Sequence, residues 1–339
     1  MRKPTLYQFA TERMKTIVDH LLRLSNESHG FVSPKDAHLA DDNSAALLLC
    51  GKGLHIDELP PPAGRKKAWL SRSALPFDLE RAATGVIYSH LRVFVDELIE
   101  YAFDQTDAFQ KATPEWIYEN PQILPVITHV AGTFSKQELS RVVGHISDAG
   151  ISKPAGKRLA KLLSSLRRSQ VPKPDQVRER MKATTEGIVR DLVGRILLEE
   201  FVASALRRSR VPFRREGDYE ALSGVVYDFR ADFVVPEEDH PKAFVEVRKS
   251  STRHASLYAK DKMFSAINWK GRHQDCLGIL VVDGPWTGSS LEVMTKVFDY
   301  VVPISRISQV TEKIRDYLEG DKSVLRWLVH FRIDPHVAS

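Results

Sequence analysis

Asp232 and Glu246 are the residues of this sequence best placed to do chemistry. Asp232 opens an apolar run at residues 231–235, and Glu246 lies in the middle of a second run at residues 243–247. Alternate residues of a strand point to opposite faces of a sheet, so the valines beside Glu246 can enter the core while Glu246 points the other way with Arg248. An acidic side chain inside an apolar strand is costly unless a partner offsets its charge.

A divalent cation is one such partner. If the two runs form neighbouring strands, the carboxylates of Asp232 and Glu246 would converge on one point, which suits a hard cation such as Mg²⁺ or Mn²⁺. A cation held there could polarise a scissile phosphate and lower the pKa of a bound water molecule. The competing interpretation is structural. In it, Asp232 ends a hairpin turn and Glu246 pairs with Arg248 or Lys249 on a solvated face of the sheet.

The arrangement resembles the PD-(D/E)xK nuclease superfamily, which includes most type II restriction endonucleases and the archaeal Holliday-junction resolvases. The resemblance covers residues 185–251 clearly and the following helix and strand more loosely. It implies that Asp232 matches the family's aspartate and that Glu246 matches its (D/E). It also implies that Glu199, with Glu200 as the alternative, is the acid that the preceding helix contributes to the metal site.

The family's lysine is the main departure, because Arg248 stands in its place. An arginine cannot serve as a base, so its contribution there would be electrostatic. Lys249 is adjacent but would need a bulge in the strand to turn toward the site. A lysine from the next helix, Lys260 or Lys262, is the third possibility. The family's proline is also missing, since Ala231 precedes the aspartate.

Basic residues are concentrated in one part of the chain. Residues 151–215 carry 17 lysines and arginines against 6 acidic residues, whereas the rest of the chain carries 32 against 38. Charge segregated in this way is typical of a protein that binds a polyanion, here double-stranded DNA. Seven residues, on or beside two predicted helices, are expected to contact DNA phosphates. They are Lys157, Arg158, Lys161, Arg253, His254, Lys260 and Lys262.

The sequence pattern changes near residue 175, which predicts two domains. Residues 1–175 are expected to form a mostly helical domain for DNA recognition or dimerisation. Residues 176–339 are expected to form an α/β nuclease domain with a mixed sheet flanked by helices, like that of restriction endonucleases. Within the first domain, the helix over 152–168 could be the recognition helix of a helix-turn-helix.

Hydrophobic periodicity sets the expected elements. Helices are predicted over residues 7–24, 77–103, 105–118, 120–132, 135–148, 152–168, from 174 or 184 to 209, 255–269, 289–298 and 308–320. Strands are predicted over residues 224–227, 231–235, 243–247, 277–282 and 300–302. Residues 26–73 are expected to be irregular, because three consecutive prolines and a glycine interrupt them.

Several other functional classes are disfavoured. No apolar run approaches the roughly 18 residues of a membrane helix, and the N-terminus lacks the apolar stretch of a signal peptide. Cys50 and Cys276 form neither a zinc motif nor a disulfide framework, so a cytoplasmic location is expected. The Gly156–Lys157 pair lacks the rest of a P-loop, so no nucleotide cofactor is expected.

These observations predict a Mg²⁺-dependent endodeoxyribonuclease, and a type II restriction endonuclease is the preferred interpretation. No helicase or ATPase motif accompanies the nuclease motif, and a homodimer with two-fold symmetry would match a palindromic site. Three alternatives stay open. They are a structure-selective repair or resolving nuclease, a catalytically inactive DNA-binding protein of the same fold, and an unrelated α/β interaction protein.

Overall fold

The computed structural model describes residues 4–133, 135–166, 170–250 and 255–330. The chain divides into two compact units, Met1–Val193 and Gly194–Ser339. The boundary expected at residue 175 lies at the start of helix α10 (Pro174–Leu192), whereas the division falls just after that helix ends. Helix α10 belongs to the first unit because it packs against α5 (Leu79–Gln105) and α1 (Leu6–Glu27).

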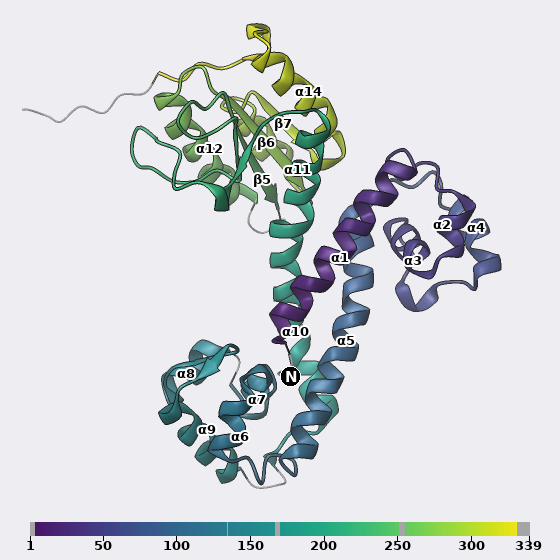
Figure 1. The fold of residues 1–339 in the computed structure, drawn as a ribbon, viewed down its shortest axis with the longest axis vertical. Helices are drawn as coiled ribbons and strands as arrows, with labels where there is room; N and C mark the ends of the chain where they lie inside the picture. The colour runs from purple at the N-terminus through teal and green to yellow at the C-terminus, as the bar shows by residue number, and fades with distance from the viewer. Residues whose placement is uncertain (1–3, 134, 167–169, 251–254, 331–339) are drawn as a thin grey trace, which may run out of the picture. The chain divides into compact units, whose positions relative to one another are not determined.

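The first unit is mostly helical, as the sequence predicted (Figure 1). Thr5 and Asp78 cap α1 and α5 by accepting hydrogen bonds from backbone N–H groups of the first turn. Apolar residues at helical spacing line the buried faces of α1 and α5. In the part of the chain that the structure describes, no helix is both long enough and apolar enough to cross a bilayer.

Residues 26–73 correct the prediction of an irregular segment, because they contain α2 (Asp36–Ala40), α3 (Asp42–Gly51) and α4 (Pro62–Leu70). Helix α3 is buried on all sides from Ser44 onward, so its sequence has no polar face and no amphipathic period. Pro62 lies in the first turn of α4, where the missing N–H group of proline costs nothing. The prolines that predicted a loop therefore begin a helix.

The helix predicted over 105–118 is wrong at its beginning. Residues 107–109 all adopt left-handed backbone conformations, with φ between 50° and 66°. A run of left-handed residues cannot continue a right-handed helix, so α6 (Pro114–Glu119) starts only after it. Helix α7 (Leu124–Val130) follows and lies within the helix predicted over 120–132.

The expected helix-turn-helix is interrupted by a small hairpin. Helix α8 (Lys136–Val143) and helix α9 (Lys153–Ser165) are separated by β1 (Ile146–Ser147) and β2 (Gly150–Ile151), which pair antiparallel. Both predicted helices are present, but they are not joined by the three- or four-residue turn of that motif. The basic helix α9 therefore does not follow α8 directly, as the recognition helix of a helix-turn-helix would.

The second unit contains a five-stranded mixed sheet in the order β3-β4-β5-β6-β7 (Figure 1). Strands β3, β4 and β5 pair antiparallel, whereas β5, β6 and β7 pair parallel. The strands are β3 (Arg214–Arg215), β4 (Phe233–Val235), β5 (Ala243–Lys249), β6 (Leu277–Asp283) and β7 (Tyr300–Pro303). The mixed α/β architecture is confirmed, while the finer likeness to restriction endonucleases stays a prediction.

The strand predicted over 224–227 does not form. The N–H groups of Val225 and Val226 donate to the backbone and side-chain oxygens of Asn268, at 3.1 and 2.8 Å. The Asn268 amide in turn donates to the carbonyl of Tyr227 at 3.0 Å. These bonds replace a strand ladder, so an apolar sequence of strand type is held as a loop against a helix.

Helices cover both faces of the sheet, which buries β5 from Ala243 to Val247. Phe244 of β5 packs against Trp269 of α12, with their ring centroids 4.9 Å apart. The helices of this unit are α11 (Glu199–Arg208), α12 (Ala255–Arg272), α13 (Gly288–Met294) and α14 (Ile307–Leu318). The face of β5 that carries Phe244 and Glu246 is therefore covered by α12.

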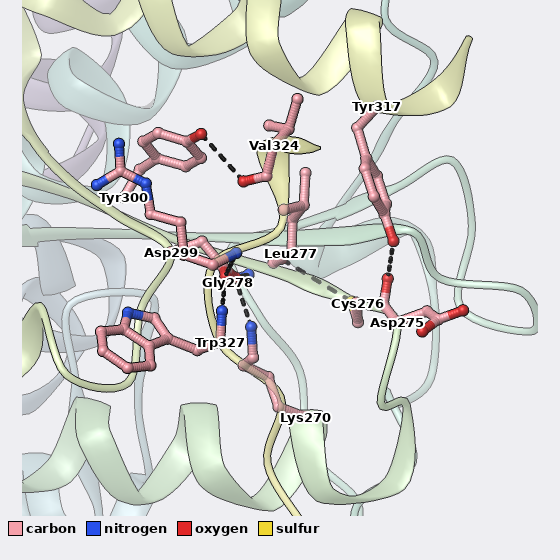
Figure 2. Close-up of polar contacts among 11 residues, drawn as sticks. Lys270, Asp275, Cys276, Leu277, Gly278, Asp299, Tyr300, Tyr317, Val324 and Trp327 are labelled. Carbon is pink, nitrogen blue, oxygen red and sulfur yellow. Dashed lines mark hydrogen bonds and ion pairs between the residues drawn. The ribbon is translucent and has the colours of Figure 1, made fainter. Parts of the chain in front are cut away.

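A buried ion pair ties the end of the described chain to the sheet (Figure 2). Asp299 accepts hydrogen bonds from the Lys270 ammonium at 2.5 Å and from the Gly278 N–H at 2.7 Å. Its other oxygen accepts from the N–H groups of Arg326 and Trp327, at 2.8 and 2.9 Å. Both side chains of the pair are fully buried. Four donors on one carboxylate make this a structural centre.

Candidate active site

The strand register brings Asp232 and Glu246 together. Phe233 of β4 is paired with Val245 of β5, so the next step along this antiparallel register places Asp232 opposite Glu246 on the same face. The Asp232 carboxylate also accepts a hydrogen bond from the N–H of Val247 at 2.6 Å. The two acids that the sequence singled out therefore lie across one strand pair.

Glu246 does not lie on a solvated face, because its exposed fraction is only 1%. Its carboxylate forms an ion pair with Lys262 of α12, whose side chain is 13% exposed. Among the three possibilities for the family's lysine, this contact favours a lysine from the next helix. Lys260 is exposed on the same helix, and the stem of Lys249 lies against Gly284 at the end of β6. Lys262 is the lysine that the structure brings to the glutamate.

Arg248 lies two residues beyond Glu246 and also faces α12. Its guanidinium lies over the ring of Tyr258, 4.5 Å from the ring centroid. Its Nε atom is buried and has no hydrogen-bond partner. A buried guanidinium N–H without an acceptor can bind an anionic oxygen of a ligand. Arg248 therefore fits the electrostatic contribution expected from the sequence.

The surroundings of the two glutamates favour Glu199 over Glu200 as the helix acid. Burial would raise the pKa of Glu200, but hydrogen bonds from Arg215 and Arg207 outweigh it and lower that pKa. By contrast, burial and the Asp232 carboxylate raise the pKa of Glu199 to about 8. Glu200 is thus held in a structural ion-pair network, while Glu199 is electrostatically coupled to the candidate site.

Burial disfavours the ionised form of the carboxyl groups at this site. Burial and the Asp232 carboxylate raise the pKa of Glu246 to about 8, even with Lys262 alongside. Burial likewise raises the pKa of Asp232, although Lys262 opposes it. For Lys262 itself burial favours the neutral form, but the two carboxylates outweigh it and raise its pKa. Lys262 and Arg248 act to lower the pKa of both carboxyl groups without offsetting burial, so a further cation would favour the ionised forms.

The donor chemistry fits a hard divalent cation, since carboxylate oxygens are the ligands that Mg²⁺ prefers. Among the described residues, however, no three His, Cys, Asp or Glu side chains are grouped closely enough to hold a metal ion. A cation at this site would be held between Asp232 and Glu246, with Glu199 coupled through its charge. Lys262 would have to move away from Glu246 for both carboxylates to become ligands.

Five further residues were expected to contact DNA. Arg253 and His254 lie outside the described residues. Lys157, Arg158 and Lys161 are exposed on α9 in the first unit. Arg158 donates a hydrogen bond to the carbonyl of Val143 at 3.0 Å, so part of its donor capacity is used within that unit.

Tyr219 is a residue near the site that sequence reasoning missed. Its buried hydroxyl donates to the carbonyl of Ala231 and accepts from the Ala231 N–H, both at 2.7 Å. Burial raises the pKa of Tyr219, so the hydroxyl keeps its proton for the first of these bonds. Both bonds fix the backbone immediately before Asp232. No local signal marks this tyrosine, because its partner lies twelve residues away along the chain.

Comparison with protein-family models, curated proteins and solved structures found no match to this chain. The basis for a function is therefore the geometry of Asp232, Glu246, Lys262 and Glu199.

Proposed function

We propose that this protein is a Mg²⁺-dependent endodeoxyribonuclease that hydrolyses phosphodiester bonds of double-stranded DNA. A type II restriction endonuclease acting as a homodimer is the preferred form of this activity. One observation carries the proposal. Asp232, immediately before β4, lies one step beyond the paired residues of the register, opposite Glu246 of β5, and a lysine of the covering helix contacts the glutamate. This combination is what the superfamily resemblance requires, with the lysine supplied by α12 instead of β5.

Each residue has a chemical task in this proposal. Asp232 and Glu246 would hold the cation, which polarises the scissile phosphate and lowers the pKa of a bound water molecule. Lys262 would stabilise negative charge as the water oxygen attacks phosphorus and the bridging P–O bond breaks. Arg248, through its free Nε–H, would donate to a non-bridging phosphate oxygen. Glu199 would keep its proton until the cation arrives.

Cleavage assays on plasmid and linear duplex DNA test this function. The wild-type protein should cut duplex DNA with Mg²⁺ or Mn²⁺ and lose the activity with a chelator. Asp232→Asn keeps an acceptor for the Val247 N–H but removes a charged ligand, so cleavage should fall at least about a hundredfold. Lys262→Met should also reduce cleavage strongly. Lys313→Ala, an exposed lysine of α14, is the matched control and should cut like wild type.

A catalytically inactive DNA-binding protein is the second candidate, and one observation favours it. The Lys262 ammonium contacts Glu246, where the cation would otherwise bind. If this ion pair is permanent, the site would carry no metal, and the protein would bind DNA without cutting it. Metal-dependent cleavage that disappears in Asp232→Asn rejects this candidate, whereas DNA binding without cleavage under all metal conditions would reject the nuclease.

A further inference from the structure

A stack of four aromatic rings runs from the core of the second unit to its surface. Trp269 is fully buried, and Phe229, Tyr227 and Phe264 follow it in order. Successive ring centroids are 4.3, 4.5 and 5.8 Å apart, and successive planes differ by 28°, 26° and 19°. The two outer rings are exposed, Tyr227 by 48% and Phe264 by 43%. The stack therefore ends in open aromatic surface.

The outer rings are held rigidly. Asn268 of α12 binds the backbone of the loop that carries Tyr227 through both its side-chain oxygen and its side-chain nitrogen. Gly224 lies so close to this amide that a Cβ atom there would be 1.9 Å from the Asn268 nitrogen. The loop also closes on itself, because Asp228 accepts from the Gly224 N–H at 3.0 Å. Exposed aromatic side chains with so much backbone support are preorganised for a planar ligand.

The stack opens beside an exposed lysine and on the other side of α12 from the candidate site. Helix α12 carries both Phe264 and Lys262, but side chains two residues apart on a helix point in nearly opposite directions. Lys260 is exposed one helical turn before Phe264, so it lies on the same side of the helix as that ring. A planar stacking surface with a neighbouring exposed ammonium matches a nucleotide, whose base stacks while its phosphate meets the lysine.

We infer that the outer face of Phe264, with Tyr227 stacked behind it, stacks on an unpaired base of a bound DNA strand. This inference rests on the proposed function and adds a binding preference for DNA with unpaired bases beside the duplex, such as a flap or a single-stranded overhang. A fully paired duplex has its bases stacked internally and offers no free face to these rings. A protein partner could cover the same surface with aliphatic side chains, but it would not require parallel rings.

Binding of oligonucleotides labelled with 2-aminopurine tests the inference, because the fluorescence of this base is quenched when it stacks. The probes are a duplex with a single-stranded overhang that contains 2-aminopurine and a blunt duplex of the same sequence with the label paired. Wild-type protein should bind the overhang probe more tightly and quench it. Phe264→Leu should weaken that binding roughly tenfold and abolish quenching, with blunt-duplex binding unchanged. Phe264→Trp should restore both.

Leu257→Ala is the matched control, since Leu257 is a 61% exposed apolar residue of the same helix, two turns before Phe264. It should bind both probes like wild type. Thermal melts show whether each variant folds. If Phe264→Leu does not fold, Phe264→Trp still tests the inference, because it should bind and quench the overhang probe. Equal binding and quenching by folded Phe264→Leu and wild type would overturn the inference.

The two proposals fail in different ways. If wild type cuts duplex DNA with Mg²⁺ but neither prefers nor quenches the overhang probe, the stacking inference is wrong and the nuclease stands. If wild type quenches the probe through Phe264 but cuts no DNA with any metal, stacking stands and the nuclease is wrong. If Phe264→Leu changes the sedimentation of the DNA-free protein, the surface joins two copies of the chain and the inference is overturned.

Discussion

Helix α12 carries two lysines, one buried and one half-buried, that meet carboxylates in opposite ways. Lys270 and Asp299 are both fully buried, and Asp299 accepts four hydrogen bonds, so charge and hydrogen bonding are balanced. Lys262 meets Glu246 beside a second carboxyl group, and burial and Asp232 raise the pKa of Glu246 to about 8, so this lysine does not fully stabilise the charge of the glutamate. The same residue types, eight positions apart on one helix, thus make two different centres. In the saturated centre the carboxylate has all its charge and hydrogen-bond partners, and in the unsaturated centre it does not. Saturation stabilises a fold, whereas an unsatisfied charge can bind a ligand.

The largest effect should come from breaking the saturated pair. Asp299→Ala leaves the Lys270 ammonium buried without a counterion and leaves three backbone N–H groups without their acceptor. We expect a loss of about 3–5 kcal/mol in the free energy of unfolding, measured by urea denaturation. Glu312→Ala, an exposed residue of α14, should change stability by less than about 0.5 kcal/mol. A stable Asp299→Ala protein would contradict the structural assignment of this pair.

The unsaturated centre should respond to metal instead. Mg²⁺ at one hundred times its dissociation constant should raise the free energy of unfolding of the wild-type protein by about 2.7 kcal/mol. Asp232→Asn should remove this stabilisation, because it removes a charged ligand, while Asp299 remains intact. Thermal shift with and without Mg²⁺ measures the difference. Equal stabilisation of both proteins would place the cation elsewhere.

The two centres should also differ in their response to pH. Burial and the Asp232 carboxylate raise the pKa of Glu199 from 4.5 to about 8. A carboxyl whose folded-state pKa is raised stabilises the fold below its unfolded pKa, and that contribution is lost as pH rises through the folded pKa. Without metal, the wild type should therefore lose stability relative to Glu199→Gln between pH 4.5 and 8. The expected difference is of the order of 2 kcal/mol.

Urea denaturation across this pH range makes the comparison, with Glu312→Gln as the control for an exposed acid. Mg²⁺ should reduce the difference, because a bound cation favours the ionised carboxylates. A difference between wild type and Glu199→Gln that stays constant from pH 4.5 to 8 would show that Glu199 is not coupled to the site.

The smallest effect concerns the backbone before Asp232. Tyr219→Phe removes the hydroxyl that pairs with both the N–H and the carbonyl of Ala231. We expect a loss of about 1–2 kcal/mol in the free energy of unfolding and weaker Mg²⁺ stabilisation, since Asp232 would be held less firmly. Tyr300→Phe also removes a tyrosine hydrogen bond, the one to the carbonyl of Val324, and serves as the control. It should leave Mg²⁺ binding unchanged.

The local sequence pattern was sufficient to predict the strands around the candidate site and helices α1 and α5. The strands around Asp232 and Glu246 follow from runs of β-branched and aromatic residues. Helices α1 and α5 follow from their amphipathic periods. Prediction failed where tertiary contacts decide the outcome. Helix α3 is buried all round and shows no period, and residues 224–227 are held by a side chain more than forty positions later in the chain.

The sequence by itself determined which acids could act together, because strand alternation and a short hairpin place Asp232 and Glu246 on one face. Only the tertiary structure decided which basic residue joins them. Lys262, Lys260, Lys249 and Arg248 were all compatible with the pattern, and the packing of α12 on β5 brings Lys262 to the glutamate. Packing also gave Glu199 and Glu200 different surroundings, because the arginines that pair with Glu200 come from α11 and β3. Contacts of this kind depend on how helices lie on a sheet, which no local spacing encodes.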